Sequence, residues 1–198
     1  MSDKSTYRGY KIISGAATTL LTLDDVRAHL NLPASLGNDA YLASLVRAAT
    51  KAAETYTGLS LLSQTVQDQH DGFPCGRTPI VLRLSPVTAI TSIAYTDTAG
   101  DSQTWTNGEY VTDLVSSPAR IAPGVDYNYP STSTKIGSVQ VTYTAGFGST
   151  AASVPQDIIH AVRMLVADYY ENRGEAPREM RTSVQALLAP YVVYEIYD

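Results

Sequence analysis

The sequence predicts an α+β fold, in which antiparallel strands are inserted into a small bundle of helices. Two capped stretches with helical periodicity lie on either side of a middle that alternates short apolar and polar runs between turn residues. Because the strands run together between helical blocks, this pattern favours α+β over alternating βαβ units. We expect helices at about 22–31, 38–57, 155–172 and 183–189, and an antiparallel β insertion at about 61–145.

Composition narrows the class of protein. A chain of 198 residues with 44% hydrophobic content can bury the core of one domain, and 14 tyrosines favour strands. The net charge of −5 argues against a protein that coats nucleic acid. A single cysteine, Cys75, excludes an internal disulfide or a cysteine-based zinc site. We expect no signal peptide at Met1 and no membrane partner, because no apolar run approaches the length of a bilayer.

The domain organisation follows from these segments. We expect a single domain over 1–198 in which residues 1–20 form an N-terminal arm without clear periodicity. Tyr10, Ile12 and Ile13 either lie on a neighbouring protein or belong to a frayed terminus, and we favour the frayed terminus. The other parts are a helical core at 21–60 and 150–190, the β insertion at 61–149 and a C-terminal tail at 191–198.

The first two helices carry local start and stop signals. Thr22 is a good N-cap, with Asp25 in the capping-box position, and Pro33 ends this short helix. Asn38 caps the second helix, and Gly58 supplies the left-handed residue that ends it. The apolar residues of the second helix recur with helical spacing: Leu42, Leu45, Val46, Ala49, Ala53 and Tyr56.

The middle of the chain reads as five to seven short strands. The runs are 61–69, 80–84, 90–95, the stretch near Trp105, 110–111, a short segment near Arg120 and 138–145. Asn107-Gly108 predicts a hairpin between Trp105 and Tyr110, because this dipeptide favours two-residue turns. The last run, in which Val139, Val141 and Tyr143 alternate with polar residues, leads through Gly146 and Gly148 toward the helix at Pro155.

That third helix has Ser153 as its candidate cap and Asp157 near its positive end. Its expected buried stripe comprises Ile158, Val162, Leu165, Val166 and Tyr169. After Gly174 the chain is rich in charges of both signs, which is typical of a solvated face. A last short helix stops at Pro190.

The sequence Gly146-x-Gly148-x-x-Ala151 resembles a dinucleotide-binding turn, since it follows a strand and precedes a helix. Three features oppose that interpretation: hairpins precede the strand, no βα unit follows, and Asp168 lies within a helix and not at the end of a second strand. A plain strand-to-helix turn is therefore the better prediction.

Asp68, His70 and Asp71 form the strongest candidate metal cluster, but we favour a solvated turn. His29 and His160 have no evident partner, and Cys75 reads as an unreactive loop thiol. No nucleophile and base pair can be inferred. We therefore expect no catalytic residue, no cofactor and no metal.

An ordered set of short segments resembles the head–tail connector (adaptor, or head-completion) proteins of long-tailed bacteriophages and gene transfer agents. The resemblance spans about residues 20 to 192. Its segments are 21–30 (LTLDDVRAHL), 53–58 (AETYTG), 82–87 (LRLSPV), 90–95 (ITSIAY), 141–148 (VTYTAGFG), 154–158 (VPQDI) and 169–173 (YYENR).

This resemblance implies a structural virion neck protein without enzymatic activity. It implies a homo-oligomeric ring of twelve subunits beneath the portal protein, which extends the DNA channel and docks the next neck or tail protein, either a tail terminator or a head-closure protein. DNA would pass through the lumen without specific binding, in keeping with an acidic chain. The protein would be made in the cytoplasm of a host bacterium. Another tail-completion or head-closure role is the alternative, and a small enzyme is a more distant one.

In proteins of this kind the C-terminal segment often reaches the portal, which makes the apolar tail the candidate docking element. Its alternative is to fold back on its own core. The candidate interface residues are Tyr191, Val192, Val193, Tyr194, Ile196 and Tyr197.

Overall fold

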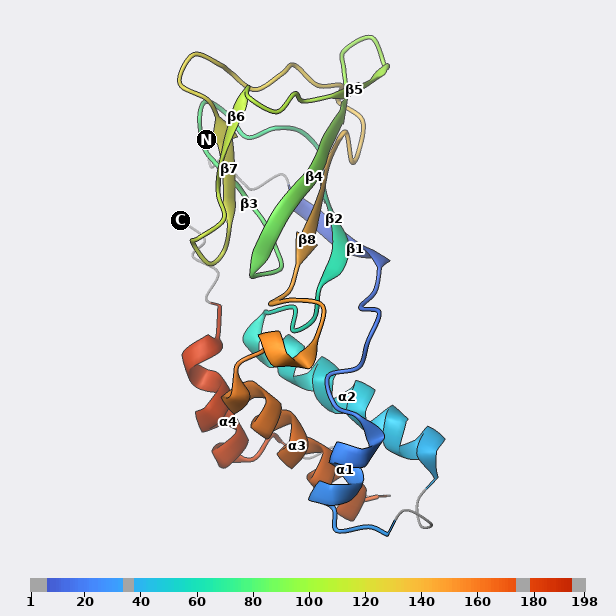
Figure 1. The fold of residues 1–198 in the computed structure, drawn as a ribbon. Helices are drawn as coiled ribbons and strands as arrows, with labels where there is room; N and C mark the ends of the chain where they lie inside the picture. Colours follow the sequence, from blue (N-terminus) through green and yellow to red (C-terminus); the bar gives the residue numbers. More distant parts are fainter. Residues whose placement is uncertain (1–6, 34–37, 174–178, 194–198) are drawn as a thin grey trace. The chain divides into compact units, whose positions relative to one another are not determined.

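The computed structural model describes residues 7–33, 38–173 and 179–193. Within them the chain divides into two compact units, each built from two separate stretches. A β unit comprises residues 7–15 and 63–146, and a helical unit comprises residues 16–62 and 147–193. Figure 1 shows strands in the first and helices in the second, which confirms the α+β fold class.

The helical unit contains α1 (Leu23–His29), α2 (Asp39–Thr57), α3 (Gln156–Glu171) and α4 (Thr182–Leu188), with short 3-10 turns at Ala151–Ser153 and Ala189–Tyr191. α2 packs against α3, and both also contact α1 and α4. The stripes predicted on α2 and α3 form the core of this unit. Its fully buried members include Leu42, Ala49, Ala53, Ile158 and Val162.

The predicted caps of the first two helices are confirmed. The Thr22 hydroxyl accepts the backbone N–H of Asp25 at 3.1 Å, and the Asp25 carboxylate accepts the Thr22 backbone N–H at 3.2 Å. Asn38 accepts the Tyr41 N–H, and Gly58 ends α2 in the left-handed conformation at φ 73°. The third cap is different, because Pro155 occupies the N-cap position of α3 and Ser153 lies in the preceding 3-10 turn.

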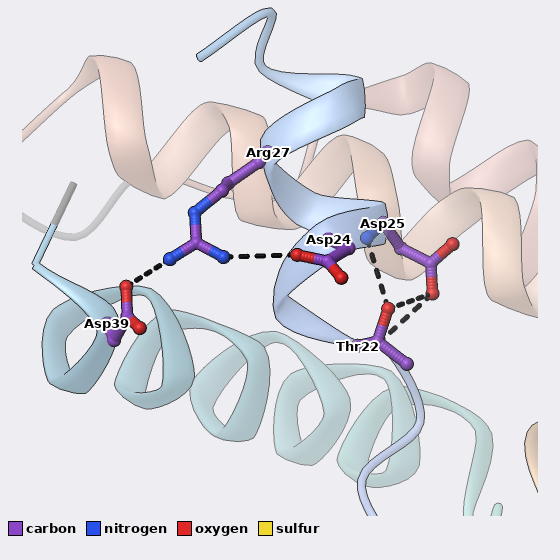
Figure 2. A network of polar contacts seen from close by, with 5 residues as sticks. All are labelled: Thr22, Asp24, Asp25, Arg27 and Asp39. Atoms are coloured by element: carbon purple, nitrogen blue, oxygen red, sulfur yellow. Dashed lines mark hydrogen bonds and ion pairs between the residues drawn. The ribbon is translucent and has the colours of Figure 1, made fainter. Parts of the chain in front are cut away.

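An arginine joins the start of α1 to the start of α2. Figure 2 shows the Arg27 guanidinium between Asp24 of its own helix, at 3.2 Å, and Asp39 in the first turn of α2. Arg163 of α3 reaches the Asp25 carboxylate at 3.8 Å. Arg27, in the last turn of α1, thus pairs α1 with α2, and Asp25, in the acidic first turn that suits the helix dipole, pairs it with α3.

The β unit contains two antiparallel sheets. The first has the order β1 (Tyr7–Ser14), β2 (Gln64–His70), β8 (Val139–Ala145), β4 (Val87–Thr96) and β5 (Ser102–Thr104). The second has the order β3 (Ile80–Val81), β7 (Arg120–Pro123) and β6 (Tyr110–Asp113). Every pairing is antiparallel, as predicted.

β8 is the central strand of the larger sheet. Its residues alternate strictly between buried and half-buried, and Val139, Val141, Tyr143 and Ala145 are completely buried. Both of its edges are paired, to β2 and to β4. Side chains from both sheets complete this core, among them Val66, Leu82, Ile93 and Ile121. An aromatic cluster lies beside it: the Phe73 ring stacks on Tyr129 at 5.0 Å and meets Trp105 edge-on at 5.2 Å between ring centroids.

The frayed terminus that we favoured at residues 1–20 is wrong for residues 7–14, which form β1 and pair with β2. The strand was hard to predict because its apolar residues, Tyr10, Ile12 and Ile13, do not alternate cleanly and all remain exposed. Backbone pairing, which leaves little trace in a sequence, defines this element.

The predicted hairpin at Asn107-Gly108 is also wrong. A turn does form there, with the Glu109 N–H donating to the Thr106 carbonyl at 3.1 Å and Gly108 at φ 107°. However, β5 before the turn pairs with β4, whereas β6 after it pairs with β7. The turn therefore carries the chain from one sheet to the other.

The predicted strand at 80–84 is shorter than expected, since β3 ends at Val81. Leu82 and Leu84 still point inward and are buried. The backbone N–H groups beyond Leu82 find side-chain acceptors in place of a strand: Arg83 donates to the Asp68 carboxylate at 2.9 Å, and Leu84 donates to the Tyr143 hydroxyl at 3.1 Å.

We expect Thr22→Ala to destabilise the helical unit by about 1 kcal/mol, because the Asp25 N–H loses its acceptor and the capping box opens. Thr22→Ser is the matched control, since it keeps the hydroxyl. Urea unfolding followed by far-ultraviolet circular dichroism measures the difference. Equal stability of the alanine and serine variants would show that the box contributes nothing.

Candidate functional site

The C-terminal segment, residues 191–193, lies on the helical unit. The Val193 backbone N–H donates to the carbonyl of Thr57, the last residue of α2, at 2.8 Å. The Tyr191 hydroxyl donates to the Asp157 carboxylate in the first turn of α3 at 3.3 Å. Desolvation, together with the neighbouring Asp157 carboxylate, raises the pKa of the Tyr191 hydroxyl. The segment is thus attached at the C-terminal end of α2 and the N-terminal end of α3.

Its local sequence explains this path. Pro190 lies in the 3-10 turn that follows α4, where the chain cannot continue as an α-helix. Gly58 adopts its left-handed conformation next to Val193, whose Cβ lies 3.6 Å from the position of a Cβ on Gly58. The free carbonyls at the end of α2 accept a donor from outside the helix, as helix ends require. A backbone hydrogen bond therefore anchors the segment, and packing of the Val193 side chain against the helical core adds to it.

The structure brings together only part of the predicted docking element. Tyr191, Val192 and Val193 are half-buried, and Tyr191 and Val193 pack against the helical core. Tyr194, Ile196 and Tyr197 lie outside the described residues.

The solvated turn that we favoured for Asp68 and His70 is wrong. Asp68 is fully buried and His70 is 4% exposed, because both project from β2 into the β core. One Asp68 oxygen accepts the Tyr143 hydroxyl at 3.0 Å, and the other accepts the Arg83 backbone N–H. Burial raises the pKa of the Asp68 carboxyl to about 6, and burial lowers the pKa of the His70 imidazole to about 4. Asp68 therefore holds strands and a connecting segment together.

The third member, Asp71, serves the turn after β2. Its carboxylate accepts the Gly137 N–H at 2.9 Å, and its carbonyl accepts the Ser138 hydroxyl at 2.6 Å. Among the described residues, no three histidine, cysteine, aspartate or glutamate side chains are arranged to hold a metal ion. These acidic groups are used in internal hydrogen bonds.

The glycine turn after β8 is explained by packing. Gly146, at φ 132°, donates its N–H to the Pro86 carbonyl at 2.8 Å. A Cβ on Gly148 would lie 2.3 Å from the Ser153 hydroxyl oxygen, so only glycine fits beside the 3-10 turn. The backbone here is used for chain reversal and close approach, as the strand-to-helix interpretation predicted.

The remaining sequence candidates are surface groups. His29, His160 and Cys75 are exposed. Arg181, from the mixed-charge stretch, pairs with Asp168 of α3. In the part of the chain that the structure describes, no helix is both long and apolar enough to cross a membrane.

A family model described as head completion protein matches residues 19–183. A chain from a solved "virion of native gene transfer agent (GTA) particle" is 26% identical, with a TM-score of 0.80, and the match covers 96% of this chain and 98% of that chain. No curated protein sequence matches this chain.

Two structures of particle necks are similar at the same coverage of 96% and 98%. The "neck of empty GTA particle computed with C6 symmetry" is 26% identical with a TM-score of 0.78. The "neck of native GTA particle computed with C12 symmetry" is 25% identical with a TM-score of 0.78. The likeness thus extends over both units of the fold.

Asp68 and His70 should give the β unit two opposing pH dependences. Asp68 stabilises the fold fully below pH 3.8 and loses this contribution as pH rises through about 6. His70 stabilises it fully above pH 6.5 and loses this contribution as pH falls through about 4. We expect Asp68→Asn to lose stability on acidification from pH 7 to 4, by roughly 2 kcal/mol more than the wild type.

Urea unfolding at a series of pH values measures this slope, and slopes are compared because Asp68→Asn also alters the buried hydrogen bonds at every pH. Asp101→Asn, at an exposed aspartate of the same unit, is the control and should follow the wild type. His70→Asn should show the opposite slope. A profile of Asp68→Asn parallel to the wild type would contradict the assignment.

Proposed function

This chain belongs to the head completion protein family, and we propose that it forms a ring in a virion neck that joins the portal to the next neck or tail protein. It is a structural protein of the neck, and the family and the neck structures agree on that role. The proposal is supported chiefly by the likeness over 96% of the chain to two particle necks at a TM-score of 0.78 and to a virion chain at 0.80.

A ring of twelve copies is the proposed assembly. The similar necks were computed with C12 and C6 symmetry, and a twelve-membered ring is compatible with both. Cyclic rings of one chain require two different surfaces on each subunit, one for each neighbour.

The charge of the chain supports a channel through which DNA passes without being held. The net charge is −5, and affinity for DNA comes chiefly from lysine and arginine contacts to phosphates. Several arginines are already paired with carboxylates of the same chain, namely Arg27, Arg120, Arg163 and Arg181. These ion pairs reduce the positive charge that is available to phosphates.

The C-terminal tail is the proposed portal-docking element. The anchor holds residues 191–193 on the helical unit, and the apolar residues Tyr194, Ile196 and Tyr197 follow them in the sequence. We assign the anchoring role to Tyr191, Val192 and Val193 and the portal contact to the residues after them. Burial of aromatic and aliphatic side chains on a partner would supply the binding energy.

A head-closure or tail-completion role is the alternative, and it differs in the partner that the tail binds. Binding to the portal favours the adaptor role, whereas binding only to a later neck protein favours the alternative. Because the anchor residues precede the proposed docking residues, the docking residues can be removed without removing the anchor. A loss of portal binding would then not be caused by misfolding.

We expect deletion of residues 194–198 to abolish binding to the cognate portal while the thermal unfolding midpoint stays unchanged. The hydrogen bonds of the anchor involve Tyr191 and Val193, both of which remain. Pull-down on immobilised portal and negative-stain microscopy of the mixture measure binding and ring formation.

The control is Val125→Ala, which removes an apolar side chain that is 86% exposed outside the C-terminal segment and leaves the anchor intact. Portal binding retained by the deletion variant would contradict the docking role of the tail. A lowered unfolding midpoint would instead show that the tail stabilises its own fold.

A further inference from the structure

β1 lies at one edge of the five-stranded sheet. Within the described residues it pairs with β2 alone, so alternate N–H and C=O groups along its other edge have no neighbouring strand. The opposite edge of the same sheet, β5, is only three residues long, whereas β1 has eight. A long open edge is a ready template for another strand, which proteins ordinarily shorten or cover.

Apolar side chains of β1 continue the core-facing side of the sheet but remain exposed to solvent. Tyr10 and Ile12 pair in register with Asp68 and Val66, whose side chains are buried, so they lie on the core-facing side. Nevertheless Tyr10 is 39% and Ile12 is 45% exposed, and Ile13, at an irregularity in the pairing, is 52% exposed. None of the three is among the buried residues of the β core.

We propose that β1 is a lateral interface between subunits, occupied by a second copy of this chain. The proposal rests on the ring proposed above, because each subunit of a ring presents one surface to a neighbour that differs from the surface it receives. An open strand edge with an uncovered apolar face supplies both backbone hydrogen bonds and buried area for such a contact.

The charges of β1 also favour a second copy of this chain as its binding partner. The sequence of β1 contains Arg8 and Lys11 and no acidic residue. The rest of the chain contains the other 12 lysines and arginines and all 19 aspartates and glutamates, so its net charge is −7. A basic strand on an acidic protein is complementary to another copy of the same protein.

The test places charges on β1 in the full-length chain. Ile12→Glu with Ile13→Glu should weaken ring formation by about tenfold or more in subunit concentration, because each carboxylate would be buried without a partner. Val115→Glu with Ile136→Glu is the matched control, since Val115 is 99% and Ile136 is 88% exposed outside β1. Ring occupancy on portal is counted by negative-stain microscopy, and thermal unfolding checks that both variants fold.

The results separate this inference from the proposed function. A wild-type chain that forms no ring on portal overturns both. A wild-type ring that the β1 variant forms as well as the control does overturns the β1 interface alone. A photo-crosslinker at position 13 in the otherwise wild-type chain identifies the occupant: a product joining two copies supports the proposal, whereas a product with the portal or within one chain overturns it.

Discussion

The central position of β8 is the constraint on which the rest of the β unit depends. A strand paired on both edges must satisfy every backbone group through its neighbours, and burial of one face fixes its register. Tyr143 shows how far this constraint reaches, because its hydroxyl lies at the correct depth to bind Asp68 and to receive the Leu84 N–H. One strand thereby positions β2, β4 and the irregular segment that follows β3.

Burial of the Asp68 carboxylate is energetically unfavourable, but its hydrogen bonds link several segments of the β unit. A carboxylate in an apolar core is unfavourable without donors, and here Tyr143 and the Arg83 backbone supply them. Two residues along the same face of β2, His70 is buried as well. Acid favours the fold through one group and opposes it through the other, so the pair limits the net effect of mild acidification on this unit.

Local signals made the helices predictable, whereas long-range contacts decided what was missed. The Thr22 capping box, the Asn38 cap and Gly58 are encoded within a few residues of the helices they delimit. Burial of Asp68 depends on partners 15 and 75 residues away, which no local pattern reveals. For the candidate site, the apolar tail was visible in the sequence, but its anchor on the Thr57 carbonyl was not. β1 escaped prediction because its apolar residues do not alternate cleanly and remain exposed to solvent.

The interleaving of the two units has a consequence for synthesis on the ribosome. α2 is complete at Thr57, but its packing partner α3 begins at Gln156, about a hundred residues later. At typical translation speeds of 5–20 residues per second, the apolar stripe of α2 waits on the order of 5–20 s for its partner. The β unit can close first, once β8 has emerged at Ala145. α3, α4 and residues 191–193, which all follow β8 in the chain, then complete the helical core, so the Val193 contact to Thr57 forms only after α3 has been made.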